Sequence, residues 1–171
     1  MPRNVEIKAR ARDLVRQERL AADLAGEPAM EIVQEDVFFH VAQGRLKLRI
    51  FADGTGELIQ YHRPDASEPS QSDYIVAPVT APGPVRQALD LALGTRAVVR
   101  KRRTLLMAGR TRIHLDRVEG LGDFIELEVV LAEGEDLAQG VETAWKLMAQ
   151  LGIRDDDLVE AAYVDLLEGG A

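Results

Sequence analysis

Charged and apolar residues alternate with a period of two in several short segments of this chain. Lys47 and Arg49 alternate with leucine and isoleucine, and the same period occurs in residues 4–10, 110–117 and 124–129. Successive side chains of a β-strand point to opposite faces, so this period predicts strands with one charged and one apolar face. Few architectures accommodate several such strands, because each charged face must meet water or a charged partner.

Turn signals that contain glycine separate these segments and join them into hairpins. The links AQG, DGTG and EGLGD each fall between two segments of strand-like composition. Such links are typical of β-hairpins. A polar stretch rich in proline and serine, residues 64–72, is expected to be a loop. The expected strands are residues 4–10, 29–41, 44–52, 57–63, 73–79, 95–109, 110–118 and 124–133.

Four further segments have helical character. Asp13 can cap a helix that runs to about Ala25, and residues 81–94 place a proline in a first helical turn. An amphipathic helix is expected over 136–152, and the tail 154–170 is expected to be helical up to its end. Hairpin-linked strands with a few helices favour an α+β fold, an eight-stranded antiparallel β-barrel (tunnel) with a charged lumen and three or four helices packed outside.

Length and composition narrow the class of protein. The absence of a long linker predicts one domain over residues 1–171. The chain has no cysteine, which excludes disulfides and thiolate chemistry and fits a cytoplasmic location. The first residues lack the apolar region of a signal peptide, and no apolar run approaches the roughly 18 residues of a membrane span. No membrane partner is therefore expected.

The distribution of charge points to a small anionic ligand. The net charge of −8 argues against a nucleic-acid partner, because a general nucleic-acid binder needs an excess of basic residues. Basic residues concentrate instead in residues 45–49, 100–103 and 110–117. This distribution indicates a focused anion site built on strands.

The parity of a residue, its odd or even position along a strand, assigns the charged side chains to one side of the predicted sheet. If the apolar faces point outward under the helices, the charged faces point into the barrel. The carboxylates of this set fall on the first strand and the last two. The inward side has Glu6, Lys8, Lys47, Arg49, Tyr61, Arg63, Lys101, Arg103, Arg110, Arg112, His114, Asp116, Glu126 and Glu128, and the opposite side has Arg100, Arg102 and Arg117.

A lumen of this kind needs a ligand that offsets its own repulsion. A polyanion would relieve the repulsion among the cations, because Arg can hold phosphate oxygens in a bidentate manner. Mg²⁺ or Mn²⁺ would do the same among the carboxylates, and a triphosphate with its metal meets both needs. Alternating charges also suit a solvated outer face, and the pattern by itself leaves both interpretations open.

Six short motifs give the chain a resemblance to a known family. They are EIK at 6–8, LKLR at 46–49, RKRR at 100–103, RTRIHLD at 110–116, ELE at 126–128 and AYVDLL at 162–167. No single motif is specific, but their order and spacing together resemble the CYTH family, the triphosphate tunnel metalloenzymes. The stretch from GRLKLR to FIELE is most similar to the class IV adenylate cyclase branch.

The resemblance implies a tunnel that holds a triphosphate-containing small molecule, ATP or tripolyphosphate, together with Mg²⁺ or Mn²⁺. In a class IV adenylate cyclase, the ribose 3′-hydroxyl attacks the α-phosphorus of ATP and pyrophosphate leaves. The resemblance implies a catalytic role for Glu6 and Lys8. The implied metal-binding carboxylates are Glu6, Asp116, Glu126 and Glu128, and the implied phosphate-binding cations are Lys8, Lys47, Arg49, Arg63, Lys101, Arg103 and Arg112.

One position departs from the pattern of the family. The family signature near the start is Glu-x-Glu-x-Lys, and this chain has Asn4 in the first position, followed by Glu6 and Lys8. An amide can ligate a metal through its carbonyl oxygen, but it brings no charge and cannot act as a base. The departure counts against a second metal site and against the activation of water that triphosphatases need.

Three functions therefore remain open. They are an enzyme of the cyclase type, a triphosphatase for inorganic, nucleoside or thiamine triphosphate, and a non-catalytic binder of polyphosphate or nucleotide. Asn4 favours the binder, whereas four inward carboxylates favour an enzyme, because a pure anion binder has no need of them. A homodimer is also left open. Among the remaining lumen residues, His114 is expected to be a hydrogen-bonded structural residue, and Tyr163 either closes one tunnel end or packs in the core.

Overall fold

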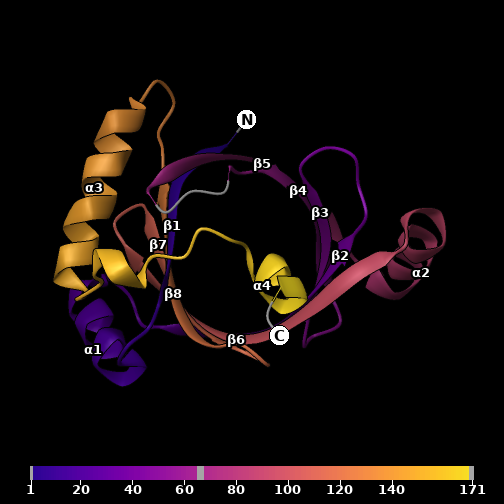
Figure 1. Cartoon of the computed structure of the whole chain (residues 1–171), viewed down its shortest axis with the longest axis horizontal. Coiled ribbons are helices and arrows are strands. Elements are labelled where there is room, and N and C mark those ends of the chain that lie inside the picture. Colours follow the sequence, from indigo (N-terminus) through magenta and orange to yellow (C-terminus); the bar gives the residue numbers. More distant parts are fainter. Residues whose placement is uncertain (1, 65–67, 170–171) are drawn as a thin grey trace.

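Eight antiparallel strands close into a barrel in the computed structural model, which describes residues 2–64 and 68–169 (Figure 1). Around the barrel the strands follow the order β1-β5-β4-β3-β2-β6-β7-β8. The elements are β1 (Arg3–Arg10), α1 (Leu14–Leu24), β2 (Met30–Phe39), β3 (Arg45–Phe51), β4 (Gly56–His62), β5 (Ser70–Val79), α2 (Pro82–Leu93), β6 (Thr95–Ala108), β7 (Thr111–Val118), β8 (Gly122–Val130), α3 (Leu137–Gln150), the 3₁₀ helix η1 (Asp155–Asp157) and α4 (Tyr163–Gly169).

The predicted fold class, strands and hairpins are confirmed. β2, β3, β4 and β5 pair in succession, and β6, β7 and β8 form a second meander. The helix capped by Asp13 is also confirmed, since the Asp13 carboxylate accepts a hydrogen bond from the backbone N–H of Arg16. The loop expected over 64–72 is shorter than predicted, because β5 begins at Ser70; residues 65–67 of that prediction lie outside the described residues.

The apolar core lies between the outer wall of the barrel and the helices. α1 and α3 cover one side of the barrel and α2 covers the opposite side (Figure 1). Under α1 and α3, the side chains of Ile113 and Leu127 are fully buried. Under α2, Leu48 is fully buried against Val85. Because each such side chain contributes about 1.5–3 kcal/mol when buried, this outer core stabilises the barrel and frees its interior for charge.

The approach of α3 to the barrel depends on a glycine. A Cβ atom at Gly140 would lie 2.6 Å from Cδ2 of Leu131 and 2.8 Å from Cγ2 of Val5. Side chains of other residues therefore do not fit at this contact. The missing side chain lets α3 pack directly on β1, the strand that has Glu6 and Lys8 on its other face.

The tail corrects one prediction. Residues 154–170 were expected to be one helix, whereas the structure has η1, an extended stretch and only then α4. The Asp157 carboxylate accepts a hydrogen bond from the backbone N–H of Arg154 and pairs with Arg12, which favours a short turn over a longer helix. The next segment is held extended by the backbone N–H of Val159, which donates to the carbonyl oxygen of Lys8.

This extended stretch carries α4 across one mouth of the barrel (Figure 1). Tyr163 and Val164 of α4 are buried against Phe38, Val99 and Phe124, which project from three strands. The Tyr163 and Phe124 rings meet edge to face with centroids 5.0 Å apart. This apolar cluster closes one end of the lumen.

Candidate functional site

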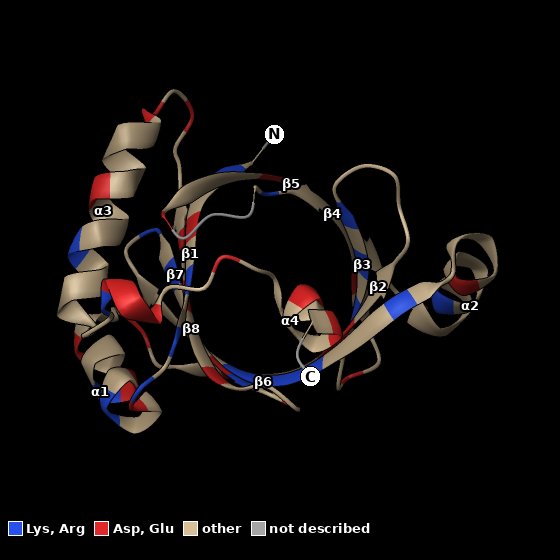
Figure 2. Cartoon of the chain, viewed as in Figure 1, with Lys and Arg blue, Asp and Glu red and all other residues tan. Residues whose placement is uncertain are grey.

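The lumen is a cavity of about 380 Å³ lined by side chains from all eight strands of the described chain. Its volume falls in the range of about 300–1,000 Å³ typical of small-molecule sites. Eight of the described lining residues are Lys or Arg, and six are Asp or Glu. Figure 2 shows that Lys, Arg, Asp and Glu residues lie along the strands of the barrel wall, for example in the blue segments of β6. The charged faces therefore point inward, as parity predicts.

The structure brings most of the predicted site residues together in this cavity. Arg100, Arg102 and Arg117 lie exposed on the opposite face, in agreement with parity. Arg110 does not reach the lumen, because it lies in the turn before β7 and pairs with Glu135. The predicted residues that line the cavity are Glu6, Lys8, Lys47, Arg49, Arg63, Lys101, Arg103, Arg112, Glu126 and Glu128.

Asp116 is the predicted site residue that does not line the cavity. Its two carboxylate oxygens accept hydrogen bonds from Nε and Nη2 of Arg103, both at 2.7 Å, and one also accepts from Oη of Tyr163 at 2.9 Å. Burial would raise the pKa of Asp116, but Arg103 and Lys101 outweigh it and hold the pKa at about 2. Asp116 is thus an ionised carboxylate that positions Arg103 and Tyr163.

Asp36 of β2 is a lumen residue that the sequence did not reveal. Its carboxylate accepts hydrogen bonds from Nζ of Lys47 at 2.9 Å and from Nε and Nη2 of Arg49 at 2.8 and 2.9 Å. Burial would raise the pKa of Asp36, yet Arg49 and Lys47 hold it well below its usual value. Together with Glu57 of β4, Asp36 corrects the expectation that the inward carboxylates are confined to the first strand and the last two.

Burial perturbs the lysines of the lumen. Nζ of Lys8 lies 3.5 Å from Oε1 of Glu126 and 3.8 Å from the ring centroid of Tyr163. Nζ of Lys101 lies 3.7 Å from Oδ2 of Asp116. Burial, followed by the neighbouring charge of Arg103, lowers the pKa of Lys101 to about 7, and burial also lowers the pKa of Lys8. An anion placed among these groups would favour their charged forms.

Three carboxylates gather on the neighbouring strands β1 and β8. Glu6 and Glu128 are directly paired in the sheet, and Glu126 lies two residues along β8. Burial raises the pKa of Glu6, and the charges of Glu128 and Glu126 raise it further, although Nη1 of Arg63 lies 3.1 Å from Oε2 of Glu6. A cation bound between these acids would remove this repulsion, so the donor set fits a divalent metal.

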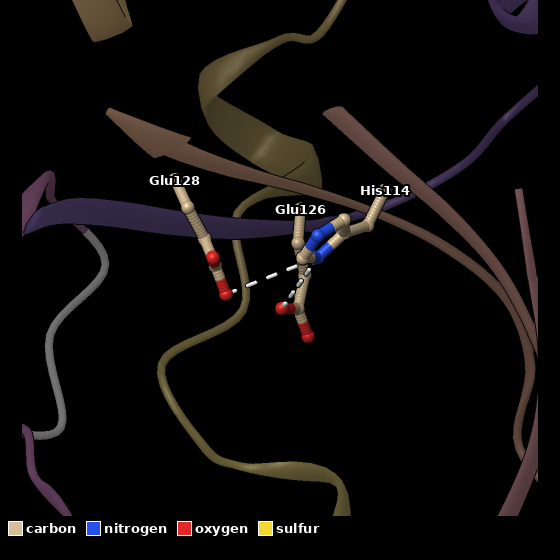
Figure 3. Close-up of side chains that lie close together, drawn as sticks. All are labelled: His114, Glu126 and Glu128. Carbon is tan, nitrogen blue, oxygen red and sulfur yellow. Dashed lines mark ion pairs between the residues drawn. The ribbon is translucent and has the colours of Figure 1, made fainter. Parts of the chain in front are cut away.

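His114 joins this acidic group from β7 (Figure 3). One ligand atom from each of His114, Glu126 and Glu128 lies within 4.8 Å of the others, so these three described residues could hold a metal ion. Nδ1 of His114 is buried and has no hydrogen-bond partner among the described residues. The register of β7 and β8, which sets this proximity, was not available from the sequence alone.

Comparisons with known proteins agree with the fold. The family model of the CYTH domain matches residues 2–163. The solved structure of the PH1012 protein from Pyrococcus horikoshii OT3 has a TM-score of 0.85 and 23% identity, covering 95% of this chain and 98% of that one. A candidate adenylate cyclase from Vibrio parahaemolyticus has a TM-score of 0.78 and 18% identity, covering 96% and 97%.

A third solved structure carries a different activity on the same fold. A candidate adenylyl cyclase from Hippeastrum, described as revealing a dominant triphosphatase activity, has a TM-score of 0.69 and 14% identity, with 99% of this chain and 96% of that chain covered. No match was found among curated protein sequences. Across the described ranges, no helix combines the length and the apolar character that crossing a membrane requires.

Proposed function

The chain belongs to the CYTH family, and from the charges of its lumen we propose that it is a divalent-metal-dependent enzyme of the class IV adenylate cyclase type. Its substrate would be ATP, with cyclic AMP and pyrophosphate as products. The observation that carries the proposal is the barrel cavity, which eight Lys or Arg side chains line together with six carboxylates. Members of this family act on triphosphates, and a triphosphate with its metal complements both sets of charge.

In this proposal the phosphate groups bind to cations that are already held in place. Asp36 fixes Lys47 and Arg49, and Asp116 fixes Arg103. Preorganised cations stabilise charge in a transition state without a cost of reorganisation. The full proposed set is Lys8, Lys47, Arg49, Arg63, Lys101, Arg103 and Arg112, all of which line the cavity.

The metal would be held by Glu126 and Glu128 of β8 with Glu6 of β1. A bound Mg²⁺ or Mn²⁺ would neutralise charge on the phosphate oxygens and orient the triphosphate. We assign Asp116 a different role from the one that the resemblance implies, because both of its oxygens already accept hydrogen bonds from Arg103. Asp116 would act on the triphosphate through Arg103.

Glu6 and Lys8 would carry the proton transfer and the charge stabilisation at the reacting phosphorus. Burial is the first cause of the raised pKa of Glu6, and a buried carboxylate in the cavity suits a group that accepts a proton from the attacking 3′-hydroxyl. Lys8 lies beside Glu126 and can stabilise negative charge on the phosphate in the same region. Both side chains come from β1 and point into the cavity.

A triphosphatase is the second candidate, and the closed end of the lumen favours it. The Nζ atoms of Lys8 and Lys101 lie 3.8 and 4.9 Å from the ring centroid of Tyr163 at that end. A triphosphate that entered from the end opposite Tyr163 would place its terminal phosphate against these lysines, where water rather than a ribose hydroxyl would be the nucleophile. Asn4, which cannot act as a base, disfavours this reaction and keeps the non-catalytic binder as the third candidate.

Product analysis separates these candidates. Purified protein is incubated with Mg²⁺ or Mn²⁺ and either ATP or tripolyphosphate. Cyclic AMP with pyrophosphate identifies the cyclase, and orthophosphate identifies the phosphatase. Binding of both compounds without turnover of either would overturn the enzyme proposal and leave the binder.

A pair of glutamate variants tests the metal assignment. We expect Glu126→Gln to abolish turnover, because it removes a charged ligand from the lumen. Glu133→Gln is the matched control, since Glu133 is exposed outside the barrel. Full activity of Glu126→Gln would show that the metal assignment is wrong.

A further inference from the structure

His114 is a buried side chain that the proposed chemistry does not use. It lies on β7 directly opposite Glu126 of β8, and its exposed fraction is 4%. The imidazole points toward the space between Glu126 and Glu128 (Figure 3). This position places a nitrogen atom beside two of the three carboxylates to which the proposed function assigns the metal.

The Nδ1 atom of His114 lacks any hydrogen bond in the described chain. It lies 3.8 Å from Oε2 of Glu126 and 3.9 Å from Oε1 of Glu128, both beyond the reach of a hydrogen bond. A buried polar atom without a partner costs free energy, so a native protein rarely keeps one without a reason. An ion bound between this nitrogen and the two carboxylate oxygens would supply the missing partner of Nδ1.

The neighbouring cation leaves the space beside His114 open. An imidazole nitrogen binds metal ions in its neutral form. Arg103 itself is turned toward Asp116 and stays 3.7 Å from Oε2 of Glu126, which leaves that oxygen without a close cation.

The spacing of the three atoms is close to that of a metal site. Two ligand atoms that each lie about 2.1 Å from one ion are about 3.0–3.4 Å apart in octahedral or tetrahedral geometry. The two separations from Nδ1, 3.8 and 3.9 Å, exceed this by a fraction of an ångström, and all three ligand atoms lie within 4.8 Å of one another. Small side-chain rotations of the two glutamates would close the difference without movement of the strands.

We propose that His114 is a ligand of the lumen metal together with Glu126 and Glu128, and that this nitrogen makes the site prefer first-row transition ions over Mg²⁺. Mg²⁺ takes oxygen ligands almost exclusively, whereas imidazole raises affinity along the series from Mn²⁺ to Co²⁺. The inference rests on the proposed metal site of the lumen. It does not depend on which reaction follows, and it sharpens the choice between Mg²⁺ and Mn²⁺.

Pulsed electron paramagnetic resonance of bound Mn²⁺ tests the proposal directly. The full chain is freed of metal and loaded with Mn²⁺ in the presence of tripolyphosphate, which contains no nitrogen. We expect modulation from an imidazole ¹⁴N nucleus in the native protein and its loss in His114→Asn. His62→Asn is the matched control, because His62 is exposed on the outside of the barrel and should leave the signal intact.

Metal titrations supply a second readout that does not depend on activity. The dissociation constants of Co²⁺, Mn²⁺ and Mg²⁺ are measured by calorimetry for the native protein and both variants, after circular dichroism has shown that each is folded. We expect His114→Asn to weaken Co²⁺ and Mn²⁺ binding by about tenfold or more and to change Mg²⁺ binding little, so that the preference is lost.

The outcomes distinguish this inference from the proposed function. Mn²⁺ that binds the native protein and shows no ¹⁴N modulation, or a Co²⁺ preference that survives in His114→Asn, would overturn the role of His114 and leave the carboxylate metal site in place. A native protein that binds none of the three ions with tripolyphosphate present would overturn the proposed metal site itself, and the inference with it.

Discussion

Burial decides which side chains carry charge inside the barrel. Lys101 has an exposed fraction of only 6%, and the carboxylates of Asp116 and Asp36 lie 3.7 and 3.9 Å from its Nζ atom. These distances exceed hydrogen bonds, so the two acids only partly offset the cost of burying the ammonium group. The resulting pKa of about 7 makes the charge of Lys101 sensitive to pH and to ligands.

The affinity for tripolyphosphate should therefore fall as the pH rises through 7. Lys101 is protonated below its pKa of about 7 and neutral above it, and the protonated form attracts the anion. Calorimetric titration at pH 6 and pH 8 measures the change. Lys101→Arg stays charged over this range, so its loss of affinity should be smaller. An equal pH dependence in the native protein and in Lys101→Arg would show that Lys101 is not the titrating group.

The segment from η1 to α4 shows what a sequence pattern does not contain. Its composition is helical throughout, but long-range contacts override it. The backbone of Val159 pairs with Lys8 of β1, and the Asp157 carboxylate pairs with Arg12. By contrast, β3 was predictable because its alternation of Lys47 and Arg49 with leucine and isoleucine reflects one charged and one apolar face.

Tyr163 links α4 to the lumen, and Tyr163→Phe should weaken that link. The substitution keeps the ring packed on Phe124 but removes the hydrogen bond to Asp116. A buried hydrogen bond to a charged group contributes about 1.5–3 kcal/mol, and we expect a loss of that size in the free energy of unfolding. Urea denaturation measures it.

A second variant separates the hydroxyl from the ring. Tyr163→Leu should cost more than Tyr163→Phe, because it also removes the edge-to-face contact with Phe124. If Tyr163→Phe is as stable as the native protein, the hydroxyl does not hold α4 over the mouth of the barrel.

The barrel of this molecule has a charged inner face and an apolar outer face. The net charge is −8, yet eight Lys or Arg side chains gather in the cavity, while apolar side chains pack outside under the helices. Parity along single strands predicted this division. It could not reveal Asp36, because charged residues on both faces of β2 obscure the alternation, nor the pairing of His114 with Glu126, which depends on strand register.

The central claim is that the triphosphate binds to the inner face of the barrel wall. Removal of one positive charge from each face of β6 tests this claim most directly. Lys101 and Arg102 are adjacent in sequence, but Lys101 lines the cavity and Arg102 is exposed outside it. Calorimetry at pH 6 would give the tripolyphosphate affinity of Lys101→Gln and Arg102→Gln. We expect Lys101→Gln to weaken binding by about tenfold or more, equivalent to about 1.4 kcal/mol, and Arg102→Gln to leave it nearly unchanged. Equal losses in both variants, or a loss only in Arg102→Gln, would contradict a triphosphate site inside the barrel.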